Sequence, residues 1–194
     1  MRVEQLRTAR GVVVAGPLGL TPRVFADDRG FFLESWNQQV FEDVVGPVPF
    51  VQDNHSCSRK GVLRGLHYQL PPRPQAKLVR CIVGEIFDVA VDLRRGSASF
   101  GQWVGALLSA ANRQQLWIPE GFAHGFLSLS DPAEVLYKAT DFWSRPCERS
   151  LRWDDPTIGV AWPRERLEGA RLLLSGKDAM APRLADLGEE ALFR

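Results

Sequence analysis

The feature that most constrains the fold is the spread of aromatic and β-branched residues over many short segments, which Gly and Pro residues separate. Short apolar segments bounded by turn-forming residues are typical of β-strands, and many of them together favour a sandwich or barrel. Residues 85–93 give the clearest case, because a row from Phe87 to Leu93 alternates with a row that contains Asp88 and Asp92. A period of two places the rows on opposite faces of a strand. We therefore predict an all-β protein in which one face of this strand meets solvent or a polar cavity.

The remaining candidate elements are short as well. Further strands are expected at residues 11–14, 30–36, 76–83, 102–108, 115–118, 125–129 and 135–140. Helix is scarce: residues 37–45 have one apolar side, and residues 182–193 form a second candidate that Gly188 interrupts. The chain has 194 residues, of which 45% are hydrophobic, and no repeat or linker divides it. One domain covering residues 1–194 is therefore expected.

Charge and cysteine content limit the classes of function. Lys and Arg (24) nearly balance Asp and Glu (23), so no overall positive field exists for nucleic acid or an anionic membrane surface. The three cysteines lack C-x-x-C spacing and suggest neither a disulfide framework nor a zinc knuckle. No export signal is evident, and no apolar run approaches the roughly 18 residues that span a bilayer. We expect a soluble cytoplasmic protein that binds neither nucleic acid nor membrane.

Two segments that contain histidine resemble the two motifs of the cupin superfamily, which project histidines into a barrel. They are GVLRGLH, ending at His67, and PEGFAH, ending at His124. Metal-binding cupins place a second histidine two residues after the first and a glutamate soon after it, because a divalent ion needs three or four converging ligands. Here Gln69 holds the histidine position, and Arg73 and Pro74 hold the glutamate region. We therefore expect no metal and no other cofactor.

His67 has two interpretations. An isolated histidine in a β-rich region is more often a hydrogen-bonded core residue than a catalytic one. Arg64, Gln69 and Lys77, however, place polar and cationic groups around His67. Buried cations without a ligand are costly, so this clustering indicates an anionic guest.

A narrower resemblance covers the chain from Phe25 to Asp178. It rests on motifs that occur in a fixed order: FADDRGFF with Glu34, QDNHS at 52–56, GVLRGLHYQLPP at 61–72, QAKLVR at 75–80, DVAVDLR at 88–94, QLWIPEGFAHGF at 115–126, YKATD at 137–141, WDDP at 153–156 and LSGKD at 174–178. In these segments the chain resembles the dTDP-4-dehydrorhamnose 3,5-epimerase family of deoxysugar biosynthesis. Each motif alone is weak, but their order and joint presence make a chance match very improbable.

The resemblance implies a fold, an assembly and a set of roles. The fold would be a cupin-type jelly-roll barrel with a few short peripheral helices, in a homodimer whose partner subunit contributes to nucleotide binding. His67 would be the proton acceptor, Asp178 its orienting carboxylate, Tyr137 the proton donor, and Lys77 would lie near the keto oxygen of the sugar. The residues implied to contact the dTDP-linked 4-keto-6-deoxyhexose are Arg29, Glu34, Gln52, Asp53, Asn54, Arg64, His124, Trp143, Glu148 and Lys177.

The chemistry of such an epimerisation explains these residue types. A carbon-bound proton beside a ketone must be removed, the charge held on the carbonyl oxygen, and a proton returned to the opposite face. Histidine with a carboxylate partner is a suitable base near neutral pH. A fixed cation stabilises charge that grows in the transition state, and a neutral tyrosine can donate a proton.

Several of these assignments have a structural alternative. Tyr137 could be a core residue in a row with Val135 and Ala139. Arg29 and Arg64 suit a diphosphate because of their forked donors, but surface ion pairs are the commoner use of arginine. We interpret His55 as structural.

The chain also departs from the family pattern at positions 142 and 143, where tyrosines are often found. Phe142 lacks a hydroxyl donor, whereas Trp143 keeps a flat aromatic face that can stack on the thymine base. Nucleotide choice is therefore less well defined by the sequence than the chemistry.

Three functions remain open alongside 3,5-epimerisation of dTDP-4-dehydro-6-deoxy-D-glucose to dTDP-4-dehydro-L-rhamnose. One is epimerisation at carbon 3 or carbon 5 alone. Another is a metal-dependent cupin oxygenase or isomerase. The third is a sugar-nucleotide binding module without turnover, against which the joint presence of His67, Tyr137 and Asp178 argues, because a binder needs no matched acid and base.

Overall fold

The computed structural model describes residues 1–194 and is built mainly of strands. The strands are β1 (Arg2–Arg7), β2 (Val13–Thr21), β3 (Val24–Asp27), β4 (Gly30–Leu33), β5 (Gln52–Ser58), β6 (Leu63–Gln69), β7 (Lys77–Val83), β8 (Glu85–Asp92), β9 (Trp103–Ser109), β10 (Gln115–Ile118), β11 (Phe122–Ser128), β12 (Ala133–Ala139) and β13 (Glu148–Ser150). The helices are α1 (Gln38–Val45) and α2 (Gly176–Ala179), with short 3-10 turns at Arg164–Leu167, Leu184–Asp186 and Glu189–Ala191.

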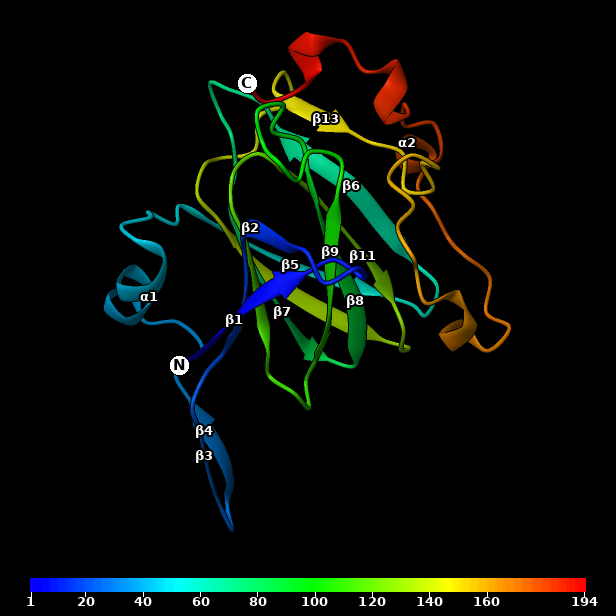
Figure 1. Ribbon diagram of the computed structural model, residues 1–194. Helices are drawn as coiled ribbons and strands as arrows, with labels where there is room; N and C mark the ends of the chain where they lie inside the picture. Colours follow the sequence, from blue (N-terminus) through cyan, green and yellow to red (C-terminus); the bar gives the residue numbers. More distant parts are fainter.

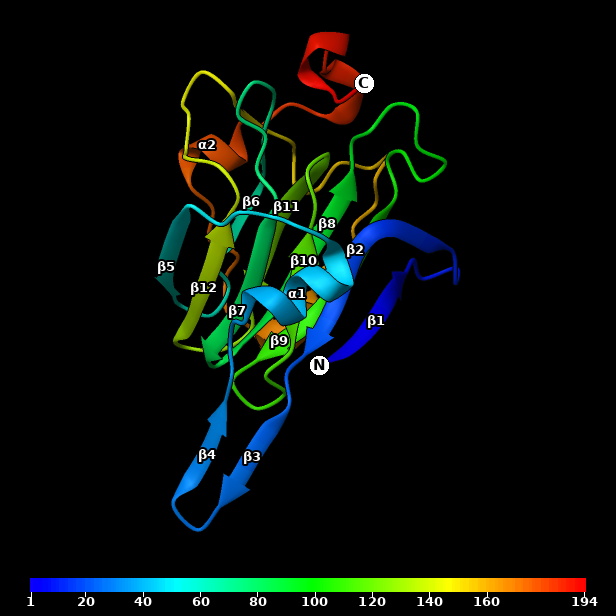
Figure 2. The same ribbon diagram turned by 90° about the vertical axis from the view of Figure 1, so that its left-hand side faces the viewer.

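Two antiparallel sheets face each other and form the body of the molecule (Figures 1 and 2). The larger sheet has the strand order β1-β2-β10-β7-β12-β5, and the smaller one has the order β13-β6-β11-β8-β9. Strands that are adjacent in a sheet are mostly distant in sequence, as in a jelly roll. The predicted cupin-type jelly roll with short peripheral helices is confirmed.

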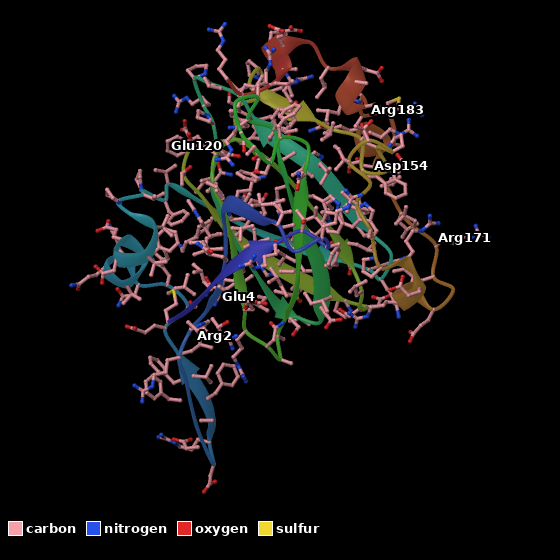
Figure 3. All side chains as sticks on the ribbon, viewed as in Figure 1. Arg2, Glu4, Glu120, Asp154, Arg171 and Arg183 are labelled. Carbon is pink, nitrogen blue, oxygen red and sulfur yellow. The ribbon has the colours of Figure 1, made fainter.

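Each sheet packs apolar side chains on both faces. Between the sheets lies a core that includes Val79, Ile86, Val104, Leu116 and Phe126. The outer face of the smaller sheet is covered by residues 151–193, and the outer face of the larger sheet is covered around α1. Figure 3 shows side chains filling the space between the sheets, whereas the charged residues that it labels are exposed. The polar site described below therefore occupies one part of an otherwise apolar interior.

The strand at residues 85–93 shows what its alternating pattern means. Ile86 and Ala90 join the core between the sheets, and Val89 and Val91 join the outer layer. Asp88 lies in the interior row and is fully buried. Exposure to solvent is therefore wrong for the two acids: Asp88 and Asp92 are both buried, the first paired with His124 and the second with Arg94.

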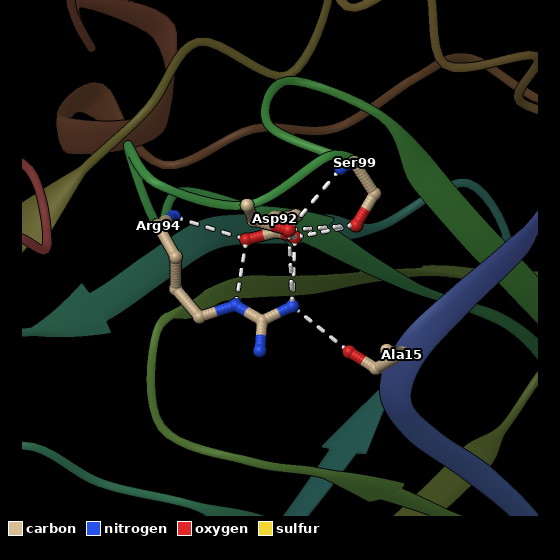
Figure 4. Close-up of polar contacts among 5 residues, drawn as sticks. Ala15, Asp92, Arg94 and Ser99 are labelled. Atoms are coloured by element: carbon tan, nitrogen blue, oxygen red, sulfur yellow. Dashed lines mark hydrogen bonds and ion pairs between the residues drawn. The ribbon is translucent and has the colours of Figure 1, made fainter.

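Asp92 is buried at the end of the same strand, at the centre of a network of polar contacts (Figure 4). Its carboxylate accepts hydrogen bonds from the backbone and guanidinium of Arg94 and from the hydroxyls of Ser97 and Ser99. Arg94 in turn donates to the backbone oxygen of Ala15 at 2.8 Å. The network joins the β8–β9 loop to β2, and its charge is paired as a buried carboxylate requires.

Strands cover part of all eight expected strand segments, and α1 is the expected first helix, with Asn37 as its N-cap. Five strands were not expected: β1, β3, β5, β6 and β13. The expected second helix is wrong, because residues 182–193 form two short 3-10 turns instead. Leu187 and Leu192 pack against the outer layer of the smaller sheet, and this packing overrides the weak helical pattern.

Three further features complete the description. None of the helices is long and apolar enough to cross a membrane. All three cysteines are free. His55 is exposed and contacts Glu134 on the neighbouring strand at 2.9 Å, outside the interior of the barrel.

Candidate active site

A bulge in β6 brings two site residues to the same face. His67 pairs with His124 on β11, but Arg64 pairs with Phe126, so β6 carries one extra residue between the two pairs. The extra residue allows Arg64 and His67, three apart in sequence, to face the barrel interior together. Gly65 occupies the bulge with φ +124°, where a Cβ would lie 2.6 Å from the Cα of Gly125. Only glycine fits both the conformation and the space.

His67 forms a dyad with Asp178. Its Nε2 lies 2.5 Å from Oδ1 of the Asp178 side chain, which is 4% exposed. The second carboxylate oxygen accepts the hydroxyl of Ser175 at 2.8 Å, and the Gly65 backbone also donates to the carboxylate. Burial opposes ionisation of Asp178, but the hydrogen bonds from His67, Ser175 and the Gly65 backbone outweigh it, and the pKa lies below its usual value. The carboxylate is therefore ionised at neutral pH and holds the imidazole with Nδ1 free.

A second dyad lies beside the first. Nε2 of His124 is 2.7 Å from Oδ1 of Asp88, and both side chains are buried. Burial lowers the pKa of His124, although the charge of Asp88 acts in the opposite direction. The other oxygen of Asp88 is buried and has no hydrogen-bond partner. His124 is thus a rigidly held neighbour of His67 on the adjacent strand.

Lys77 and Tyr137 reach the same space from the facing sheet. They lie on the adjacent strands β7 and β12, and Nζ of Lys77 is 5.9 Å from the centre of the Tyr137 ring. Burial lowers the pKa of Lys77 to about 8, against the opposing charges of Asp88 and Glu148. Burial raises the pKa of Tyr137, so its hydroxyl stays protonated. Tyr137 also packs against the core cluster that contains Val135, which agrees with the alternative interpretation of Tyr137 as a core residue.

These groups line two adjoining cavities that share His67, Lys77 and Tyr137. One cavity, of about 150 Å³, is also lined by Gln52, Asn54, Tyr68, Gln69, Gln75, Trp143 and Glu148. The other, of about 240 Å³, is also lined by Ser56, Arg64, His124, Phe126, Ser175 and Asp178. A base with its carboxylate, a cation and a phenol therefore meet in one space, with the base and the phenol on opposite sheets. No group of three His, Cys, Asp or Glu side chains converges to hold a metal ion.

Comparison with known proteins places this arrangement in a family. A family model described as dTDP-4-dehydrorhamnose 3,5-epimerase matches residues 12–186. Enzymes of that name from Salmonella typhimurium and Pseudomonas aeruginosa are 60% and 61% identical over 166 residues, which cover 85% of this chain and 88% and 89% of theirs. The chain belongs to the dTDP-4-dehydrorhamnose 3,5-epimerase family.

Solved structures of this epimerase family share the fold. The Legionella pneumophila epimerase in complex with dTDP-4-keto-L-rhamnose superposes with a TM-score of 0.90 at 44% identity, covering 100% of this chain and 98% of that one. The Mycobacterium tuberculosis epimerase gives a TM-score of 0.92 at 39% identity, covering 100% and 94%. The chain is thus an isomerase-family member over nearly its whole length.

Not all residues that the family resemblance implies lie at these cavities. The side chain of Arg29 is 90% exposed at the tip of the β3–β4 hairpin, where it pairs with Asp27 at 2.6 Å. Glu34 follows this hairpin and is exposed. Asp53 lies on the outer face of the larger sheet, bonded to Lys138, because its neighbours Gln52 and Asn54 take the inward positions of β5. Its side chain does not face the cavities.

Lys177 and Glu148 form a pair at 2.8 Å at the rim. The ion pair and the charge of Lys177 outweigh burial and lower the pKa of Glu148. Both residues are thus held beside the cavity that Trp143 lines.

Sequence reasoning missed three residues of this epimerase-family site. Asp88 was noted as an acid in a strand and in a family motif, and Gln69 as a polar group near His67 in a metal-ligand position, but neither was given a role at the site. Ser175 precedes Asp178 by three residues and caps α2. The spacing of a serine and an acidic residue three positions later is typical of a helix N-terminus, and it could have identified the pair.

Proposed function

We propose that the protein catalyses cofactor-independent 3,5-epimerisation of dTDP-4-dehydro-6-deoxy-D-glucose to dTDP-4-dehydro-L-rhamnose. The observation that carries the proposal is the convergence of the His67–Asp178 dyad, Lys77 and Tyr137 on one space between the sheets. The enzymes and the ligand complex named above support the same substrate class. The three free cysteines favour action in the cytoplasm, where thiols stay reduced.

Each group has a step in the proposed reaction. His67, with its Nε2–H donated to Asp178, uses Nδ1 to remove the proton on the carbon beside the ketone. Lys77 stabilises the enolate oxygen, because an ammonium in a low-dielectric site acts strongly on charge that develops there. Tyr137 returns a proton from the other sheet, so the configuration at the carbon is inverted. Proton exchange with solvent returns His67 to the neutral imidazole and Tyr137 to the phenol, and the same two steps at the second carbon then complete the epimerisation.

Incubation in deuterated water tests the reaction. We expect deuterium at both carbon 3 and carbon 5 of the sugar, detected by NMR or mass spectrometry. Exchange at one carbon alone would leave a single-site epimerase, and exchange at neither would refute the proposal. Full activity after treatment with a chelator is expected, whereas loss that added metal restores would favour the metal-dependent alternative.

Substitution of the acid and the base tests their roles. His67→Ala and Tyr137→Phe should each lower kcat by between about a hundredfold and ten-thousandfold, the usual contribution of general acid–base groups. His55→Ala is the matched control, since this histidine lies outside the barrel. Unchanged turnover in either variant would refute the assigned roles.

We also propose that the active form is a homodimer in which the β3–β4 hairpin reaches the partner. The hairpin projects away from the barrel in both views (Figures 1 and 2). Phe25, Phe31 and Phe32 on it are 49%, 59% and 68% exposed, which is unusual for aromatic side chains of an isolated subunit. A partner subunit would cover these rings and receive Arg29 at its substrate diphosphate.

A further inference from the structure

The loop between β12 and β13 carries an aromatic residue at the edge of the cavity. Trp143 lines the same cavity as His67 and Tyr137, yet it is 56% exposed. Phe142 beside it is also 56% exposed. Packing holds such exposed rings only in part. The Trp143 side chain also hydrogen-bonds to Glu148, and its position otherwise depends on how firmly the backbone of the loop is held.

Gln69 at the end of β6 holds this backbone on two sides. Its side chain is buried, with the residue 3% exposed. Its Nε2 donates to the backbone oxygens of Phe142 at 3.2 Å and Arg73 at 2.7 Å, and its Oε1 accepts the backbone N–H of Ser144 at 2.7 Å. The amide therefore bonds to the residues immediately before and after Trp143.

Two further glutamines complete the contact. Oε1 of Gln52 on β5 accepts the backbone N–H of Trp143 at 2.9 Å, and Nε2 of Gln75 donates to the backbone oxygen of Asp141 at 2.7 Å. Four consecutive residues of the loop are thus held by side-chain amides from both sheets and the turn before β7.

The chemistry of Gln69 explains why an amide occupies this position. A carboxamide offers donors and an acceptor at once, so it can bond to a carbonyl and to an N–H two residues apart. A carboxylate would face two carbonyl oxygens without donors, and an apolar side chain would leave the buried backbone groups unpaired. Of the three amides, Gln69 makes two of the four bonds to the loop and is the most buried, so it contributes most to the geometry of the loop.

We propose that Gln69 is a positioning residue for substrate binding, which holds the loop so that Trp143 presents its indole face to the nucleoside base of the substrate. The inference rests on the proposed function, because it needs a nucleotide-linked substrate at this cavity. It assigns to Gln69 an effect on binding that is transmitted through Trp143 alone. Proton transfer at the sugar is left to the groups already described.

A double-mutant cycle tests the proposal, with dTDP binding measured by calorimetry on the wild type, Gln69→Met, Trp143→Ala and the double variant. Methionine keeps the length and burial of glutamine but makes none of its hydrogen bonds. We expect each single substitution to weaken dTDP binding by roughly tenfold, the scale of one stacked base. The double variant should be no weaker than Trp143→Ala, because Gln69 acts through that ring.

Kinetics provide the second readout. Gln69→Met should raise KM for the dTDP-sugar while kcat stays within about threefold of the wild type, since only ground-state positioning is lost. Gln5→Met on β1 is the matched control and should change neither dTDP affinity nor KM, because Gln5 is exposed away from the site. Gln69→Asn, which keeps the amide but shortens its reach, should reproduce the effect if Gln69→Met folds poorly.

Three results would overturn the inference while the epimerase proposal stands. One is unchanged dTDP affinity in Gln69→Met. Another is additivity of the two substitutions, which would show that Gln69 acts independently of the ring. The third is unchanged affinity in Trp143→Ala, which is informative even if every Gln69 variant fails to fold. A wild-type protein that neither binds dTDP nor epimerises the sugar would instead refute the proposed function.

Discussion

Ser175 fixes the carboxylate on which the proposed base depends. Its hydroxyl donates to Asp178 and accepts the Asp178 backbone N–H, so Ser175→Ala frees the carboxylate to rotate away from His67. We expect kcat to fall by about tenfold, as for other residues that orient a reacting group, with KM nearly unchanged. Ser175→Thr should restore kcat because it keeps the hydroxyl. Steady-state kinetics of the two variants measure the effect.

A matched control separates this effect from loss of stability. Asn37 caps α1 with its side chain, as Ser175 caps α2, but lies outside the cavities. Asn37→Ala should cost about 1 kcal/mol of unfolding free energy, as Ser175→Ala should. Only the Ser175 variant should lose kcat. An equal loss of kcat in both variants would contradict the positioning role.

Deprotonation of Lys77 should set the alkaline limb of the pH profile of kcat/KM. Its lowered pKa of about 8 means that the ammonium is present below this pH and is lost as pH rises through it. We therefore expect kcat/KM of the wild type to decline above about pH 8. Lys77→Arg should retain part of the activity and move the decline to higher pH, because guanidinium stays charged. A pH profile that is the same in both proteins would exclude Lys77 as its origin.

At the residue scale, the sequence motifs predicted which residues lie together better than they predicted which way each side chain faces. His67, Tyr137 and Asp178 come from three distant motifs, and the structure places them at one site. The motif that contains Asp53 could not reveal which of its side chains face inward, because β5 was not recognised as a strand. Arg29 lies outside the cavities. The proposed homodimer would account for its position, and assembly is a property that one chain does not display.

At the scale of the element, the bulge in β6 restricts its residue most strongly, because Gly65 has a positive φ and no space for a side chain. Gly65→Ala places a Cβ 2.6 Å from Gly125 and adopts a φ of +124° that alanine disfavours, so we expect a loss of about 3 kcal/mol or more of unfolding free energy. Gly46→Ala is the control. It has φ +102° with no atom within 4 Å, so it should cost only the conformational term of about 1–2 kcal/mol. Urea denaturation compares the two, and equal losses would argue against the close approach.

The same bulge explains why the strand was not predicted. Strands are recognised in a sequence by a period of two, and the extra residue at Gly65 shifts that period between Leu63 and Leu66, which are both buried in the outer layer. β8 has no such interruption and was predicted nearly to its ends. Short strands at the edge, such as β13, are defined by pairing with β6 rather than by their own residues. Regular elements were therefore predictable, and elements shaped by their partners were not.

At the scale of the whole molecule, the covering segment and the site are linked. Residues 151–193 bury the outer face of the smaller sheet, and the same segment delivers Ser175 and Asp178 to the edge of β6. The family motif predicted the role of Asp178 without showing how it reaches His67. Packing of this segment, rather than local propensity, brings the carboxylate to the histidine.

The β3–β4 hairpin leads to a prediction that can be tested by mixing subunits of two variants. If Arg29 acts in the partner's site, a mixture of Arg29→Ala and His67→Ala subunits should recover activity, because a heterodimer contains one site with an intact His67 and an Arg29 supplied by the other chain. Random exchange of subunits makes about half of the dimers mixed. Each mixed dimer has one complete site out of two, so about a quarter of wild-type activity is expected at low substrate concentration. If Arg29 served its own subunit, no site in the mixture would hold both residues, and activity would stay at the average of the two separate variants. The assay follows product formation after the two purified variants are unfolded and refolded together, with each variant refolded alone as the reference.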